Sequence, residues 1–261
     1  MTPRVLPRVL PRVLIVAGSD SGGGAGIQAD IKTVTMLGGH AMTAITAITA
    51  QNTLGVQAVH PVPTEIVVTQ MRSVIDDLGV DAVKIGMIGS ADTALAVAEV
   101  LAGLDVPVVV DPVMVATSGS VLADAATVAG LERLIARAAL VTPNLPELAA
   151  LGGREALLAR AAAVLVKGGH AEGETVVDRL FDASGQVARW ENPRIDTRHS
   201  HGTGCTLASA IATGLGVAMS LPAAIERAIA FVRASLEHAP GLGQGQGPMG
   251  QQDATGFRCP D

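Results

Sequence analysis

The sequence predicts an α/β fold in which a mostly parallel central sheet carries helices on both faces. Short runs that are apolar throughout alternate with longer segments in which apolar residues recur at helical spacing, as they do in βαβ units. Hydrophobic residues make up 49% of the 261 residues and aromatic residues only 2%, so Ala, Val, Ile and Leu must fill a sizeable core. Small aliphatic side chains suit helices that pack closely on a parallel sheet.

The first 80 residues predict three strands and two helices. The strands are expected over residues 13–17, 42–50 and 56–59, and the helices over 27–37 and 64–78. A glycine-rich turn over 18–26 joins the first strand to the first helix. The second helix is supported by apolar residues at three- and four-residue steps, which form one stripe on a helix.

From residue 80 onward the alternation becomes regular. Strands are expected over 82–85, 108–110, 140–142 and 163–167, with helices over 93–101, 123–138 and 146–151 between them. Two further strands, 175–181 and 187–190, flank a hairpin turn and are expected to extend the sheet at one edge. Two helices, 203–217 and 221–238, complete the predicted fold.

The chain is expected to form one domain over residues 13–240, because no Pro/Ser/Gly-rich linker divides it. Residues 1–12 form an N-terminal extension that contains tandem copies of Pro-Arg-Val-Leu. We interpret the first two copies as a dispensable duplication and the third as the start of the first strand. Residues 241–261 are rich in Gly and Gln and are expected to form a flexible tail.

Charge and cysteine content argue against several classes of function. The formal net charge is −6 and aromatic residues are scarce, which argues against a nucleic-acid surface. No apolar run reaches about 20 residues, so no membrane partner is expected, and the N-terminal repeat lacks the apolar core of a signal peptide. Two cysteines, Cys205 and Cys259, give no disulfide framework, which favours a cytoplasmic location.

The glycine-rich turn over residues 18–26 is the first candidate ligand site. Its glycines allow the backbone to approach a ligand closely, and it follows the carboxyl end of a strand, where ligands bind in such sheets. It contains no Gly-Lys pair and no Gly-x-Gly-x-x-Gly spacing, so it matches neither common nucleotide motif. The alternative is a flexible turn without a ligand.

The segment His201-Gly202-Thr203-Gly204-Cys205-Thr206 is the second candidate site. Glycines at the start of a helix expose backbone N–H groups, which together with the helix dipole can bind a phosphate. The same field is expected to lower the pKa of the Cys205 thiol. The alternatives are a glycine-rich helix cap with a buried cysteine, and a metal site formed by His199, His201 and Cys205.

Polar residues after other strands form a third candidate site. Lys167 ends a strand and is expected to place an ammonium group at the ligand edge of the sheet, whereas Lys84 lies within a strand. The alternative for each is a structural lysine whose alkyl chain packs against apolar surface. Asn144 and Glu147 are three residues apart at a helix start, which would direct both toward one site. The alternative for this pair is a helix N-cap and a first-turn acid.

Together these motifs resemble the hydroxymethylpyrimidine/phosphomethylpyrimidine kinases of thiamine biosynthesis, over residues 13–248 and in the same order. The resemblance implies a ribokinase-like fold and transfer of a phosphoryl group from ATP, with Mg²⁺, first to the pyrimidine alcohol and then to its monophosphate. It also implies a homodimer and small-molecule substrates. The matching segments are 18–30, 50–52, 84–87, 111–114, 142–147, 167–170 and 201–206.

The resemblance also implies a role for individual residues. Cys205 would be the catalytic residue, and Gly202, Thr203 and Gly204 would hold the transferring phosphoryl group. Lys167 would neutralise ATP phosphates, while Asn144 and Glu147 would organise Mg²⁺ through waters, with Asp111 as a further metal candidate. Gln51 would bind the pyrimidine edge, and the rest of that pocket would consist of Gly18, Ala25, Asp30, Met87 and Val113.

Two other functions remain open from the sequence. Pyridoxal or pyridoxine kinase activity is the nearer one, because those substrates also carry a hydroxymethyl group on a ring. Similar kinases with that activity have an additional lid cysteine, which the stretch 115–120 lacks. A non-catalytic pyrimidine-binding sensor is the other, and the intact glycine-rich segment 201–206, which we name the phosphate loop, argues against it.

Overall fold

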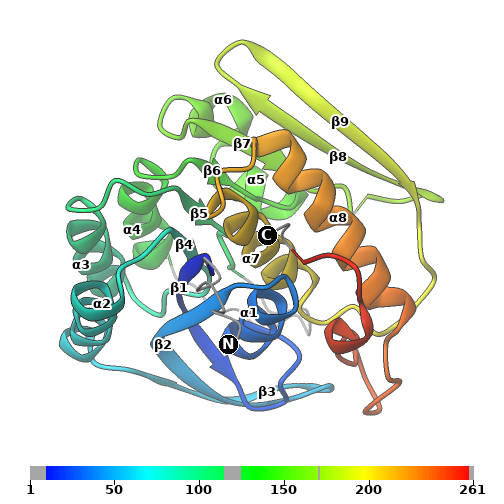
Figure 1. The fold of residues 1–261 in the computed structure, drawn as a ribbon, viewed down its shortest axis with the longest axis horizontal. Coiled ribbons are helices and arrows are strands. Elements are labelled where there is room, and N and C mark those ends of the chain that lie inside the picture. Colours follow the sequence, from blue (N-terminus) through cyan, green and yellow to red (C-terminus); the bar gives the residue numbers. More distant parts are fainter. Residues whose placement is uncertain (1–9, 115–124, 170, 259–261) are drawn as a thin grey trace, which may run out of the picture.

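The computed structural model describes residues 10–114, 125–169 and 171–258, and these contain a nine-stranded sheet with the order β3-β2-β1-β4-β5-β6-β7-β8-β9 (Figure 1). Six neighbouring strands of this sheet are mutually parallel: β2, β1, β4, β5, β6 and β7. At the two edges, β3 pairs antiparallel with β2, and β8 pairs antiparallel with β7 and β9. The expected hairpin at one edge is therefore confirmed. The strands are β1 (Arg12–Asp20), β2 (His40–Asn52), β3 (Gly55–Pro61), β4 (Ala82–Ile85), β5 (Val108–Val110), β6 (Leu140–Val141), β7 (Ala163–Val166), β8 (Thr175–Asp182) and β9 (Gly185–Pro193).

Helices cover both faces of the sheet, as the sequence predicts. Alternate residues of β1 point to opposite faces, so Leu14 and Val16 enter one hydrophobic core while Val13 and Ile15 enter the other. One face carries α2 (Thr64–Leu78), α3 (Ala91–Leu101), α4 (Ala125–Ile135), α5 (Leu145–Ala150) and α6 (Gly153–Leu158). The other carries α1 (Gly26–Met36), α7 (Thr203–Leu215) and α8 (Leu221–Glu237) (Figure 1).

Helix α6 is an element that the sequence did not indicate. It is six residues long, with Gly152 as its N-cap and Gly153 as its first residue, and the φ angles of these two glycines are +84° and +89°. Of its side chains, Leu157 is buried. A helix this short shows too little apolar periodicity to be distinguished from a loop.

The N-terminal end of the described chain belongs to the sheet. The guanidinium and backbone N–H of Arg12 donate to the carboxylate of Asp81, at 2.6 to 2.9 Å, where β1 begins. The third Pro-Arg-Val-Leu copy therefore leads into the first strand, as expected. Residues 1–9, with most of the first two copies, lie outside the described residues.

Part of the segment after Gly241, residues 247–254, packs against the fold, which differs from the flexible tail expected over 241–261. Met249, Gln251 and Ala254 are each at most 2% exposed, and the 3-10 helix η1 (Gln251–Asp253) contacts α1 and α8. The composition misled because the glycines in this segment permit close backbone packing rather than flexibility. None of the described helices is long and apolar enough to cross a bilayer.

Candidate active site

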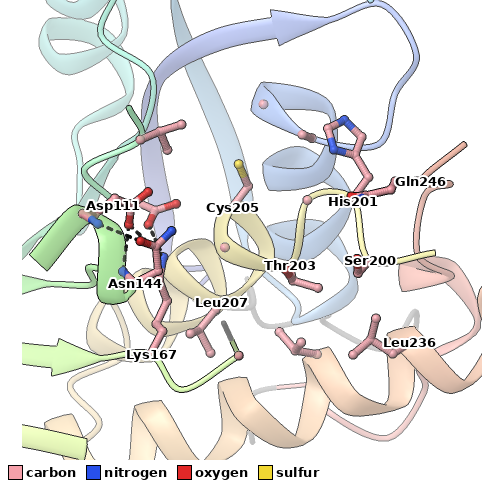
Figure 2. Close-up of a pocket in the computed structure, with 18 of the residues that line it drawn as sticks. Asp111, Asn144, Lys167, Ser200, His201, Thr203, Cys205, Leu207, Leu236 and Gln246 are labelled. Carbon is pink, nitrogen blue, oxygen red and sulfur yellow. Dashed lines mark hydrogen bonds and ion pairs between the residues drawn. The ribbon is translucent and has the colours of Figure 1, made fainter. Parts of the chain in front are cut away.

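A cavity of about 930 Å³ lies beyond the carboxyl ends of the parallel strands, where sheets of this kind bind ligands. Figure 2 shows Asp111, Asn144 and Lys167 on one side of Cys205, and His201 and Gln246 on the other. The structure thus brings together residues that are widely separated in the sequence. The sequence-predicted residues that line the cavity are Gly18, Ala25, Gln51, Lys84, Met87, Asp111, Val113, Asn144, Glu147, Lys167, His201, Gly202, Thr203, Gly204 and Cys205.

The candidate anion site lies at the start of α7. Gly202 is its N-cap and has φ +87°, a left-handed conformation that favours glycine. A Cβ atom on Gly202 would lie 1.9 Å from the carbonyl oxygen of Gly24, so the two glycine-rich loops are in direct contact. The first N–H groups of a helix lack intrahelical acceptors, and those of α7 begin at the cavity wall.

Cys205 lies in the first turn of α7 and lines the cavity. Burial raises the pKa of its thiol to about 11, which outweighs the attraction of the Lys84 ammonium group. The expectation that the helix start favours the thiolate is therefore wrong. Loss of hydration disfavours the charged form more than the helix dipole and the nearby cation favour it.

Asp30 does not lie on the cavity wall, so the structure corrects its expected place in the pyrimidine pocket. Its carboxylate accepts hydrogen bonds from Lys84 Nζ at 2.8 and 3.0 Å, and both side chains are fully buried. Ser209 Oγ donates to the same carboxylate at 2.7 Å. Since Ser209 is one helical turn beyond Cys205 on α7, this ion pair supports the face of the helix that carries the thiol.

Lys167 belongs to a second charged cluster. Its Nζ donates to Asp111 Oδ1 at 2.7 Å and lies 3.8 Å from Glu147 Oε2. Thr142 Oγ1 also donates to Asp111 Oδ1, at 3.0 Å. A Cβ atom on Gly204 would lie 3.3 Å from Lys167 Nζ, so this ammonium group adjoins the candidate anion site.

Asn144 and Glu147 form a capping box at the start of α5. Asn144 Oδ1 accepts from the Glu147 backbone N–H, and Glu147 Oε2 accepts from the Asn144 backbone N–H, each at 2.8 Å. The structure therefore confirms the helix-cap interpretation, and it also places both residues on the cavity wall. Burial raises the pKa of Glu147 to about 7 despite the nearby Lys167.

These side chains suit a hydrated Mg²⁺ ion better than a fully protein-coordinated metal. In the described part of the chain, no group of three or more His, Cys, Asp or Glu residues could hold a metal ion, which also counts against a site formed by His199, His201 and Cys205. Mg²⁺ commonly binds one or two carboxylates and keeps several waters. Asp111 and Glu147, buried beside one cavity, fit that requirement.

Asp20 organises the glycine-rich loop and was missed as a site residue. Its carboxylate accepts from the backbone N–H groups of Gly22 and Ala25, both at 2.8 Å, and lies 2.9 Å from His201 Nε2. Burial opposes ionisation, but these hydrogen bonds hold the pKa of Asp20 below its ordinary value. An Asp two residues before a glycine is a common turn signal and could have identified it.

Gln51 lies at this same end of the cavity. Its side-chain amide is 3.2 Å from His201 Nε2 and 3.1 Å from Thr49 Oγ1. Gln51 is thus held beside the Asp20–His201 pair and next to the glycine-rich loop. An amide in this position can both donate to and accept from a heteroaromatic ring.

Comparisons with known proteins agree with this geometry. A family model described as phosphomethylpyrimidine kinase matches residues 20–250. The hydroxymethylpyrimidine/phosphomethylpyrimidine kinase of Streptomyces coelicolor is 49% identical over 258 residues, covering 93% of this chain and 95% of that protein.

Two solved structures support the ribokinase-like fold that the resemblance implies. An ADP complex of Bacillus subtilis pyridoxal kinase has a TM-score of 0.86 and 33% identity, with coverage of 94% of this chain and 98% of that chain. The phosphomethylpyrimidine kinase of Clostridium difficile has a TM-score of 0.73 and 36% identity, with coverage of 86% and 98%. The motifs, the cavity and these comparisons show that the chain belongs to the phosphomethylpyrimidine kinase family.

Proposed function

We propose that this enzyme transfers the γ-phosphoryl group of ATP to 4-amino-5-hydroxymethyl-2-methylpyrimidine and then to its monophosphate, in thiamine biosynthesis. The observation that carries the proposal is that a single cavity is lined by the start of α7 with its backbone amides, by Lys167 and by Gln51. The amides and the ammonium group suit phosphates, and the Gln51 carboxamide suits a heteroaromatic ring. The kinase activity named for the Streptomyces coelicolor relative supports the substrates, and the ADP complex of the pyridoxal kinase supports ATP. Incubation with Mg-ATP and the pyrimidine alcohol, followed by mass analysis, tests it: a diphosphate product is expected.

The arrangement suits in-line phosphoryl transfer, which depends on positioning and charge stabilisation. The backbone amides of residues 202–205 hold the transferring group, and Lys167 neutralises the ATP phosphates. The substrate hydroxyl oxygen bonds to the γ-phosphorus as the bond to the β-phosphate oxygen breaks. The Cys205 thiol first releases its proton to solvent water, and the resulting thiolate then accepts the proton of the substrate hydroxyl group.

Mg²⁺ would neutralise phosphate charge when bound, with Asn144 and Glu147 orienting its waters and Asp111 nearby. Because the pKa of Glu147 is about 7, protons should compete with the ion below that pH. We expect the affinity for Mg²⁺ in the presence of ATP to rise about tenfold from pH 6 to pH 8, as Glu147 ionises. Isothermal titration calorimetry measures this.

The matched control for this prediction is Glu155→Gln, because Glu155 is an exposed acid outside the cavity. Glu147→Gln should remove the protein's share of the pH dependence, whereas Glu155→Gln should keep it. An identical pH dependence in the wild type and Glu147→Gln would rule out the role of Glu147.

Gln51→Ala should chiefly weaken binding of the pyrimidine. We expect KM for the pyrimidine alcohol to rise about 10- to 100-fold, since one polar recognition contact is lost, while KM for ATP stays within about twofold. Gln186→Ala is the control, because Gln186 is exposed on the β8–β9 hairpin. Steady-state kinetics with each substrate varied in turn give both constants, and an unchanged pyrimidine KM would contradict this role.

Pyridoxal kinase activity is the second candidate, favoured by the TM-score of 0.86 with the Bacillus subtilis pyridoxal kinase. The stretch 115–120, where a lid cysteine would be expected, lies outside the described residues, and its sequence contains none. Running the mass assay with pyridoxal and pyridoxine separates the two candidates.

A homodimer in the cytoplasm is also part of the proposal. Ile48 on β2 and Val59 on the edge strand β3 are 52% and 43% exposed, and Leu54 in the turn between these strands is 64% exposed. Exposed apolar side chains on a sheet edge favour pairing with a second copy.

A further inference from the structure

The C-terminal segment from Gly243 to Gln251, which we name the C-terminal strap, packs so closely that side chains are excluded from several of its positions. A Cβ atom on Gly243 would lie 2.3 Å from Thr53 Cγ2, and one on Gly245 would lie 2.1 Å from the Thr53 carbonyl oxygen. One on Gly247 would lie 2.2 Å from His199 Nδ1. Alternating glycines therefore let the strap contact two other segments at once.

The first contact joins the strap to the turn between β2 and β3. The backbone N–H of Gln246 donates to the Thr53 carbonyl oxygen at 3.0 Å, and that of Gly245 donates to Thr53 Oγ1 at 3.2 Å. Thr53 is two residues after Gln51. The strap thus holds the turn that follows the glutamine on the pyrimidine side of the cavity.

The second contact joins the strap to the loop before α7. The backbone N–H of His201 donates to the Gly247 carbonyl oxygen at 3.2 Å, and His201 forms a β-bridge with Pro248. Gln246 lies between these two contacts and lines the cavity, and Figure 2 shows it beside His201. The strap therefore spans from the Gln51 turn to the phosphate loop across one wall of the site.

The far end of the strap is fixed in the core. Gln251 is fully buried, and its Nε2 donates to Thr206 Oγ1 at 3.2 Å, one residue beyond Cys205. The backbone N–H of Gly250 donates to the Ser235 carbonyl oxygen of α8 at 2.9 Å. A strap fixed in this way can hold the loops that it contacts in one arrangement.

We propose that the C-terminal strap is part of the acceptor-substrate site. Its backbone positions the Gln51 turn relative to the phosphate loop, and the Gln246 carboxamide contacts the phosphoryl acceptor. This inference rests on the proposed function, because it takes the Gln51 end of the cavity as the place of the heteroaromatic alcohol. Gly245 and Thr53 are positioning residues, and Gln246 is a substrate-contacting residue.

Two substitutions release the strap from the turn. Gly245→Ala introduces a Cβ that would clash with the Thr53 carbonyl oxygen, and Thr53→Val removes the hydroxyl that accepts from Gly245. Each should raise KM for the pyrimidine alcohol about tenfold and leave KM for ATP within about twofold. Gln246→Ala should show the same split, since it removes the proposed acceptor contact. Thr53→Ser keeps the acceptor and should match the wild type.

Gly103→Ala is the matched glycine control, because a Cβ there would meet a single contact, with the Val100 carbonyl oxygen at an ordinary 3.6 Å. Hydrogen exchange of the segment 51–55 in the ligand-free protein gives a second readout, which should quicken in Gly245→Ala and Thr53→Val but not in the controls. If Gly245→Ala does not fold, the comparison of Thr53→Val with Thr53→Ser tests the inference instead.

The outcomes separate the two proposals. If the wild type has no activity on the pyrimidine alcohols, the proposed function is wrong. Hydrogen exchange of the segment 51–55 would then still test whether the strap holds the Gln51 turn. An active wild type whose strap variants keep normal exchange and a normal pyrimidine KM would overturn the inference. Equal increases in both KM values would also overturn it, because they would indicate a general structural effect.

Discussion

Cys205→Ala is expected to lower kcat by about 10²- to 10⁴-fold, the usual loss when a positioned proton acceptor is removed. Binding of ATP should change by less than about twofold, because the backbone amides of α7 and Lys167 remain. Single-turnover kinetics and ATP titration measure the two effects. Cys259→Ser, at the other cysteine of the sequence, is the control and should keep full activity.

The pH dependence of the same rate tests how Cys205 acts. With a thiol pKa of about 11, the thiolate fraction rises about tenfold per pH unit over the neutral and mildly alkaline range. If the thiolate accepts the proton, kcat should rise with pH between about 7 and 9, and Cys205→Ala should lose that rise. A flat profile, or turnover retained in Cys205→Ala, would make Cys205 a positioning residue only.

Lys84→Met is expected to reduce the free energy of unfolding by about 3–5 kcal/mol, because it leaves the Asp30 carboxylate buried without its cation. Both side chains are 0% exposed and their atoms approach to 2.8 Å. Urea denaturation monitored by circular dichroism gives the value. The double variant Lys84→Met/Asp30→Asn should recover much of the loss, since neither charge then remains.

Arg160→Met is the matched control for this prediction. Arg160 also forms an ion pair, with Glu132 at 3.1 Å, but the two side chains are 40% and 51% exposed. Exposed pairs contribute about 0–1 kcal/mol, so the control should change stability little. If Lys84→Met had the same free energy of unfolding as Arg160→Met, the buried Lys84–Asp30 ion pair would not stabilise the fold around α7 to the extent expected.

Much of the fold could be predicted because apolar spacing along the chain reports directly which side of an element is buried. The helix Thr64–Leu78 and the strands Ala82–Ile85 and Val108–Val110 have the expected bounds. The strap could not be predicted in this way, because it has no periodic apolar face. Its order comes from backbone contacts with Thr53 and His201, which are distant in the sequence.

The sequence predicted the positions of residues that directly follow strands. It predicted less well the surroundings of residues that are buried by other elements of the fold. Spacing placed Lys167 and Asn144 at the edge of the sheet, where the structure has them. Spacing could not show that Asp30 faces Lys84 in the core, or that the surroundings of Cys205 keep its thiol protonated. Both depend on how much water each group loses, which is set by elements packed from elsewhere in the chain.

The contact between Gly24 and Gly202 has a consequence for variation in this enzyme. The Gly24 carbonyl oxygen would lie 1.9 Å from any Cβ at 202, and a Cβ at 24 would lie 2.5 Å from the ring of His201. Neither position can accept a side chain unless its opposite loop retreats. In a library of random mutants selected for growth without thiamine, both codons should therefore remain glycine, even though neither residue offers a side chain to the reaction.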